Sequence, residues 1–204
     1  MIKRALCVAL ALIIGVSCVL CMTSCSSLPE IDSVRERFIY LIEQSKQLNV
    51  IFFGVGLPVY DRDDELTELR GIYYDDKLPS YNTVTYNSPY FTKESIKKKA
   101  ETIFSEKYLS LLYESAFEGL INSGSTYLRF YEYEGKIYQD VNAKNFGLSE
   151  RIYDYSTMKI VTPSNNEYIN VTVQTYTLED RKMKEVSLSF SFERGNWYLD
   201  CPTY

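Results

Sequence analysis

The stretch that decides the fold is residues 184–200, KEVSLSFSFERGNWYLD. Apolar and polar residues alternate along its first half, and a period of two is that of a strand with one buried face. The apolar set is Val186, Leu188, Phe190 and Phe192. Arg194, Gly195 and Asn196 then favour a tight turn into a last strand at 197–200. This stretch therefore predicts an antiparallel hairpin that turns one face to the core and the other to water.

A run of short extended segments precedes this hairpin. Residues 167–177 place apolar side chains at every second position, and residues 155–162 form another extended segment that stops at Pro163. Residues 127–133 and 136–139 flank a Glu-Gly pair, which is typical of a β-hairpin turn. From residue 127 onward, the sequence thus predicts an antiparallel meander.

Upstream of the meander, the apolar residues recur at helical spacing. The first predicted helix covers residues 34–48, with Ser33 and Glu36 as a capping box and Asn49 as its end. Its expected inward residues are Val34, Phe38, Leu41, Ile42, Ser45 and Leu48. Two glycines and a proline in residues 51–60 then predict an apolar, turn-rich segment.

Two further helices are predicted between this segment and the meander. Thr92 is expected to cap the first of them. Its expected inward residues are Ile96, Ala100, Ile103 and Phe104. The second covers about 106–121 and ends where Gly124 takes the left-handed conformation. Helices followed by a long meander indicate an α+β fold, in which N-terminal helices pack on one face of a curved antiparallel meander sheet.

The N-terminal residues indicate export. Lys3 and Arg4 precede an apolar run over residues 5–22, which is the arrangement of an export signal. The run ends in MTSCSS (22–27), which resembles the processing site of bacterial lipoproteins, with Cys25 as the lipid attachment residue. The segments that this resemblance implies are a signal peptide (1–24), a lipidated tether (25–32) and a single α+β domain (33–204).

The same resemblance implies a location. The folded part would lie on the outer face of the cell membrane, and its membrane partner would be reached through the lipid on Cys25. One alternative is an uncleaved anchor, since 18 apolar residues are close to the minimum that spans ~30 Å of hydrocarbon. A secreted form is the other alternative.

The composition excludes several kinds of chemistry. The 204 residues include no histidine, which removes Ser-His-Asp and Cys-His catalysis and histidine-bound zinc. Four of the five cysteines fall within residues 1–25. If processing removes the first three and Cys25 carries the lipid, Cys201 has no intramolecular disulfide partner and is expected to be structural. With 22 basic and 27 acidic residues the net charge is -5, which argues against nucleic acid as a partner.

Hydrolysis would therefore depend on carboxylates. The acidic segment 61–68 does not match a calcium-binding loop, because Leu66 and Ile72 stand where the loop requires Gly and Glu. The carboxylate pairs open to a hydrolase are Asp61/Asp63, Asp75/Asp76 and Glu132/Glu134. Their spacing selects none of them, so no catalytic residue, metal site or cofactor is expected. A carboxylate-dependent cell-envelope hydrolase is the alternative function.

A surplus of tyrosine favours recognition instead. The chain holds 19 tyrosines, whose rings offer a rigid apolar face and a hydrogen-bonding tip. Alternation in residues 167–177 places a set of aromatic and polar residues on the face opposite the core. This candidate ligand-binding set is Tyr168, Asn170, Thr172, Gln174 and Tyr176. It would fit a glycan, a peptide or a protein. The alternative is that such tyrosines cap the edge of the core.

Three longer strings resemble a group of uncharacterised clostridial lipoproteins. The strings are FFGVGLPVYDRDDE (52–65), IYDYSTMKIVTPS (152–164) with the following YINV, and NWYLDCPTY (196–204). In layout the chain is similar to nuclear-transport-factor-like or cystatin-like exported domains, and more loosely to Gram-positive inhibitors of cell-wall DL-endopeptidases. Together these features favour a membrane-anchored, non-catalytic binding module of the Gram-positive cell envelope, with an envelope protein or peptidoglycan as its partner.

Overall fold

The computed structural model describes residues 28–60, 81–122, 125–142, 148 and 150–204. The expected export signal, Cys25 and the acidic segment 61–68 lie outside these residues. Within the described part of the chain, no helix is long and apolar enough to cross a membrane.

The described residues form helices first and then mainly strands. The elements are α2 (Ile31–Phe53), β1 (Tyr81–Thr83), α3 (Lys93–Ala100), α4 (Glu106–Tyr113), the π-helical turn η3 (Glu114–Glu118), β2 (Leu120–Asn122), β3 (Ser125–Tyr127), β4 (Phe130–Tyr133), β5 (Lys136–Asp140), β6 (Arg151–Val161), β7 (Tyr168–Thr177), β8 (Lys184–Glu193) and β9 (Asn196–Leu199). Helices combined with antiparallel sheets confirm the expected α+β class.

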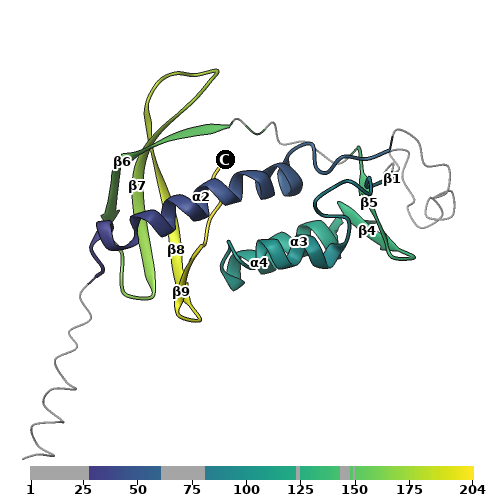
Figure 1. The fold of residues 1–204 in the computed structure, drawn as a ribbon, viewed down its shortest axis with the longest axis horizontal. Coiled ribbons are helices and arrows are strands. Elements are labelled where there is room, and N and C mark those ends of the chain that lie inside the picture. The colour runs from purple at the N-terminus through teal and green to yellow at the C-terminus, as the bar shows by residue number, and fades with distance from the viewer. Residues whose placement is uncertain (1–27, 61–80, 123–124, 143–147, 149) are drawn as a thin grey trace, which may run out of the picture.

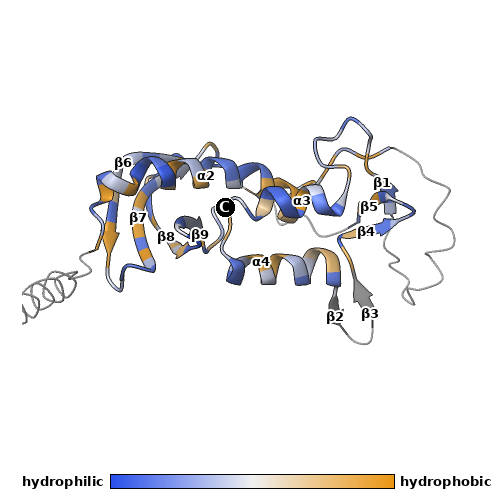
Figure 2. Cartoon of the chain, turned by 60° about the horizontal axis from the view of Figure 1, so that its bottom comes forward, coloured by the Kyte–Doolittle hydropathy of each residue, from blue (hydrophilic) through white to orange (hydrophobic). Residues whose placement is uncertain are grey.

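Strands β6 to β9 form a four-stranded antiparallel sheet in sequence order (Figure 1). Buried and half-buried residues alternate along β7, and hydropathy alternates with them (Figure 2). In β8, Leu188 and Phe190 are buried as expected, whereas Phe192 is 42% exposed. Phe192 differs because it lies at the strand end, beside the turn that Arg194 (φ 52°) and Gly195 (φ 78°) form.

Helix α2 lies across this sheet and contributes the centre of the core (Figure 1). All its expected inward residues are buried. The fully buried ring of Phe38 stacks on Phe190, with 3.8 Å between ring centroids and 6° between ring planes. Trp197 of β9 meets the same ring edge-on at 5.7 Å. Inward-facing aromatic residues of α2, β8 and β9 therefore pack together in one cluster.

The start of α2 differs from the expected capping box. The helix begins at Ile31, and its N-cap residue Glu30 makes no side-chain cap. Ser33 already lies inside the first turn and donates its hydroxyl proton to the Glu30 carbonyl at 2.7 Å. The capping box at Ser33 and Glu36 is therefore wrong, because the helix starts two residues before Ser33.

The end of α2 is also later than expected. Asn49 does not stop the helix, because its side chain turns inward and is only 3% exposed. The helix continues to Phe53, where Arg129 donates Nε–H to the Ile51 carbonyl at 2.8 Å and a second hydrogen bond to the Gly54 carbonyl. A distant arginine thus satisfies carbonyls that a helix end leaves without intrahelical partners.

The two short helices begin where the sequence predicts, but the second helical segment ends earlier than expected. Thr92 caps α3, with Oγ1 accepting from the Ser95 amide at 3.1 Å, and the four expected inward residues are buried. Helix α4 passes into η3, and the helical path ends at Gly119 (φ 87°) rather than near Gly124. Glycine takes this left-handed conformation without the clash that a Cβ would cause.

Strands β4 and β5 form the expected hairpin. Its turn has positive φ at Glu134 (49°) and Gly135 (74°), as a type I′ turn requires. The hairpin pairs with β1 in a separate sheet of order β1-β5-β4, and β2 pairs with β3 in a two-stranded sheet. One continuous meander from residue 127 is therefore wrong. The four-stranded sheet starts at Arg151, and the β1-β5-β4 sheet lies beyond the C-terminal end of α2 (Figure 1).

Candidate functional site

The residues expected to bind a ligand on β7 all lie on the face away from the core, and all are half-buried. Asn170 is engaged in the sheet itself: its Nδ2 donates to the Pro163 carbonyl, and its Oδ1 accepts from Ser189 Oγ at 2.9 Å. Tyr168 and Tyr176 stand at opposite ends of the strand, roughly 26 Å apart along it. The structure therefore brings this set onto one polar surface but does not bring its two rings together.

Three exposed aromatic side chains gather at the β1-β5-β4 sheet instead. Tyr60 is 39% exposed, Phe91 55% and Tyr86 84%. The rings of Tyr60 and Tyr86 are 6.4 Å apart between centroids. These three residues line a groove of about 360 Å³, which we call the aromatic groove. Its other lining residues are Thr83, Val84, Gly135, Lys136 and Ile137.

Backbone pairing holds the walls of the aromatic groove in place. The Val84 amide donates to the Ile137 carbonyl at 2.9 Å, and the Tyr60 amide donates to the Thr83 carbonyl at 3.0 Å. The groove is open at the hairpin turn, where a Cβ built on Gly135 would meet no atom within 4 Å. Three separate chain segments thus present a fixed backbone, and the aromatic side chains project from it.

None of the described residues that line this groove is acidic. Glu132 and Glu134 are exposed at the β4–β5 hairpin, and the pairs Asp61/Asp63 and Asp75/Asp76 lie outside the described residues. Among the residues that the structure describes, no three acidic or cysteine side chains are grouped so as to hold a metal ion.

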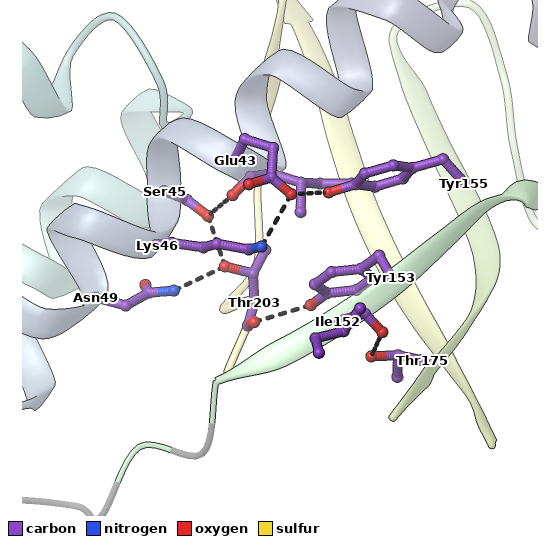
Figure 3. Close-up of polar contacts among 10 residues, drawn as sticks. Glu43, Ser45, Lys46, Asn49, Ile152, Tyr153, Tyr155, Thr175 and Thr203 are labelled. Carbon is purple, nitrogen blue, oxygen red and sulfur yellow. Dashed lines mark hydrogen bonds and ion pairs between the residues drawn. The ribbon is translucent and has the colours of Figure 1, made fainter. Parts of the chain in front are cut away.

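A buried polar network joins α2 to the C-terminal segment (Figure 3). Thr203, 3% exposed, is its centre: Oγ1 lies 2.6 Å from Ser45 Oγ and 2.7 Å from Asn49 Nδ2. Tyr153 of β6 donates its phenol proton to the Thr203 carbonyl at 2.8 Å, and burial raises the pKa of Tyr153 to about 12. The phenol therefore keeps its proton at neutral pH and remains a donor.

A second pocket, of about 270 Å³, lies beside this network, and we call it the α2 pocket. Three segments that are far apart in sequence line it: the C-terminal half of α2, the chain entering β6, and the last two residues. The lining residues are Lys46, Gln47, Asn49, Val50, Leu148, Glu150, Arg151, Thr203 and Tyr204.

Cys201 has the surroundings of a structural thiol. Its Sγ accepts a hydrogen bond from the Ser189 amide at 3.1 Å. Burial raises the pKa of Cys201 to about 11, so the thiol carries its proton at neutral pH and is a weak nucleophile. This environment agrees with the structural role expected from the sequence.

The sequence predicted neither the aromatic groove nor the α2 pocket. Ser45 was placed on the inward face of the first helix, and a serine on such a face is a signal for a buried hydrogen bond. Its partner Thr203 lies 158 residues away, and no pattern in the sequence joins them. Tyr60, Tyr86 and Phe91 stand in irregular segments, where no periodicity shows which way a side chain points.

A scan against protein-family models finds no family that matches this chain. A search of curated proteins finds no match either.

Proposed function

We propose that this chain is a lipid-anchored, non-catalytic binding module on the outer face of the cell membrane, with the aromatic groove as its ligand site. The observation that carries the proposal is the exposure of Tyr86 and Phe91, 84% and 55%, in one groove. Exposed apolar groups gathered in a hollow are typical of interaction sites. Burying one such side chain on binding contributes about 1.5–3 kcal/mol.

The proposed ligand is a component of the cell envelope, either a protein or peptidoglycan. Tyrosine and phenylalanine are enriched where proteins recognise partners, because a rigid ring loses little entropy on binding. An acidic chain of net charge -5 favours an uncharged contact over general attraction to anionic polymers.

The alternative, a carboxylate-dependent hydrolase, has less support. Such an enzyme needs two carboxylates several ångströms apart that flank one substrate bond. The described lining of the aromatic groove offers none, and that of the α2 pocket has one, Glu150. Glu132 and Glu134 are exposed at a hairpin turn rather than in either hollow.

The groove is tested by replacing Tyr86 and Phe91 together by alanine in the full chain. The double variant is expected to lose at least about tenfold in affinity, since each ring contributes binding energy at the centre of the contact. Binding is measured by sedimentation with purified peptidoglycan and by capture of envelope proteins. The matched control replaces Leu111 and Leu178, which are 59% and 63% exposed and lie outside the groove. Equal binding by the double variant and the wild type would remove the groove from the proposal.

The anchor is tested by a single change. Cys25→Ala is expected to abolish incorporation of a labelled fatty acid and to release the chain from the membrane fraction. The control is Cys201→Ala, which leaves the proposed attachment site intact. Labelling that persists in Cys25→Ala would contradict the proposed anchor.

For the fold, we propose a nuclear-transport-factor-like or cystatin-like arrangement of α2 on strands β6 to β9. A long helix packed across a four-stranded antiparallel sheet supports this likeness. An experimental structure that superposes on neither kind of domain would contradict it.

A further inference from the structure

The α2 pocket is separate from the aromatic groove and shares no lining residue with it. Its volume, about 270 Å³, is below the ~300 Å³ at which sites for drug-sized ligands begin. The pocket therefore has room for a small group, about the size of one amino acid.

The hydrogen bonds beside the pocket fix the orientation of the Asn49 amide. Ser45 Oγ lies 2.7 Å from the Ile42 carbonyl, which only accepts, so the serine proton goes there. Thr203 must then donate its hydroxyl proton to Ser45, and the Asn49 group that faces Thr203 must be the NH₂. The other amide atom, Asn49 Oδ1, is buried and has no donor among the described residues. An acceptor without a partner costs about 1–3 kcal/mol.

The charged residues of the pocket divide into a paired and an unpaired group. Lys46 is held by Glu43, with 2.9 Å between Nζ and Oε1. Glu150 and Arg151 have no ion-pair partner within 4.0 Å among the residues that the structure describes. The charge of Arg151 lies near the phenol of Tyr153. One negative and one positive side chain thus remain on the wall of the same pocket.

Part of the remaining wall is apolar. Val50 and Leu148 contribute aliphatic side chains, and the ring of Tyr204 is fixed by Phe53, with 4.8 Å between ring centroids. The pocket therefore combines a partly apolar wall with two opposite charges that have no ion-pair partner among the described residues. Asn49 Oδ1 is buried behind this wall.

We propose that the α2 pocket binds a free apolar α-amino acid. The ligand carboxylate pairs with Arg151, its ammonium group pairs with Glu150, and its side chain lies against Val50 and Leu148. A fatty acid or another simple anion would leave Glu150 facing a like charge.

The test uses the full chain in detergent and L-leucine as the probe, with binding followed by calorimetry and by the unfolding temperature. Saturable binding is expected, and it stabilises the folded chain by mass action. N-acetyl-L-leucinamide, which has the same side chain and neither charge, is expected to bind at least tenfold more weakly.

Two variants test the charged pair, and two control for it. Glu150→Gln and Arg151→Gln are each expected to weaken L-leucine binding at least tenfold. Glu179→Gln and Arg181→Gln, in the turn between β7 and β8, make the same changes away from the pocket and are expected to leave binding unchanged. Because Glu150 is exposed, its variant keeps the test valid if Arg151→Gln fails to fold.

Two outcomes overturn the proposal. One is the absence of saturable binding of L-leucine, L-valine and L-phenylalanine up to about 10 mM, where even a weak site would be partly filled. The other is equal affinity for N-acetyl-L-leucinamide and L-leucine. The groove variant at Tyr86 and Phe91 is expected to bind L-leucine normally, so failure of this proposal and failure of the proposed function are distinguishable.

Discussion

Replacing Phe38 by alanine is expected to lower the free energy of unfolding by about 3–5 kcal/mol, the range found for large-to-small changes at buried aromatic positions. Phe38 is fully buried and its ring contacts two strands at once, stacking on Phe190 of β8 and meeting Trp197 of β9 edge-on. Removing the ring leaves a cavity where helix and sheet meet, and it also removes aromatic contacts worth about 0.5–1.5 kcal/mol each.

The measurement is equilibrium unfolding in urea, followed by circular dichroism. The matched control is Leu111→Ala on α4, because Leu111 is 59% exposed and a substitution there is expected to change stability by no more than about 0.5 kcal/mol. If Phe38→Ala and Leu111→Ala unfolded at the same urea concentration, the packing of α2 on the four-stranded sheet would be wrong.

The residues around Phe38 are also those that the sequence predicted best. A helical period in α2 and a period of two in β7 and β8 identified the inward side chains, and both periods are local properties of the chain. Burial of Leu41 and Ile42 on one side and of Val171 and Leu188 on the other follows directly from them. The class of the fold was predictable for the same reason.

Features set by distant partners were not predictable. The C-terminal end of α2 depends on Arg129, which is 78 residues from Ile51, so a local stop signal at Asn49 could not locate it. The pairing of the β4–β5 hairpin with β1 is equally non-local, since turn residues fix a hairpin but not its neighbour. The aromatic groove has the same origin, because it needs Tyr60, Tyr86 and the hairpin together.

Thr203→Val is the second substitution for which we expect a large effect, a loss of about 1–3 kcal/mol of stability. The change keeps the shape of the side chain and replaces by a methyl group the hydroxyl that Asn49 Nδ2 and Ser45 Oγ both contact. A buried donor is then left without an acceptor, which costs its full desolvation penalty. Thr203→Ser is the control, because it keeps the hydroxyl and loses only a methyl group.

A second substitution in the same network determines whether hydrogen bonding is the cause. Asn49→Leu combined with Thr203→Val replaces both partners by apolar groups of similar shape, and such a pair of changes is often nearly neutral. Asn49→Leu also removes the buried Oδ1 that has no donor. The double variant is therefore expected to be more stable than Thr203→Val alone. Additive losses would instead make it less stable than either single variant. If the two losses simply added in urea unfolding, packing rather than the hydrogen bond between Asn49 and Thr203 would hold the C-terminal segment on α2.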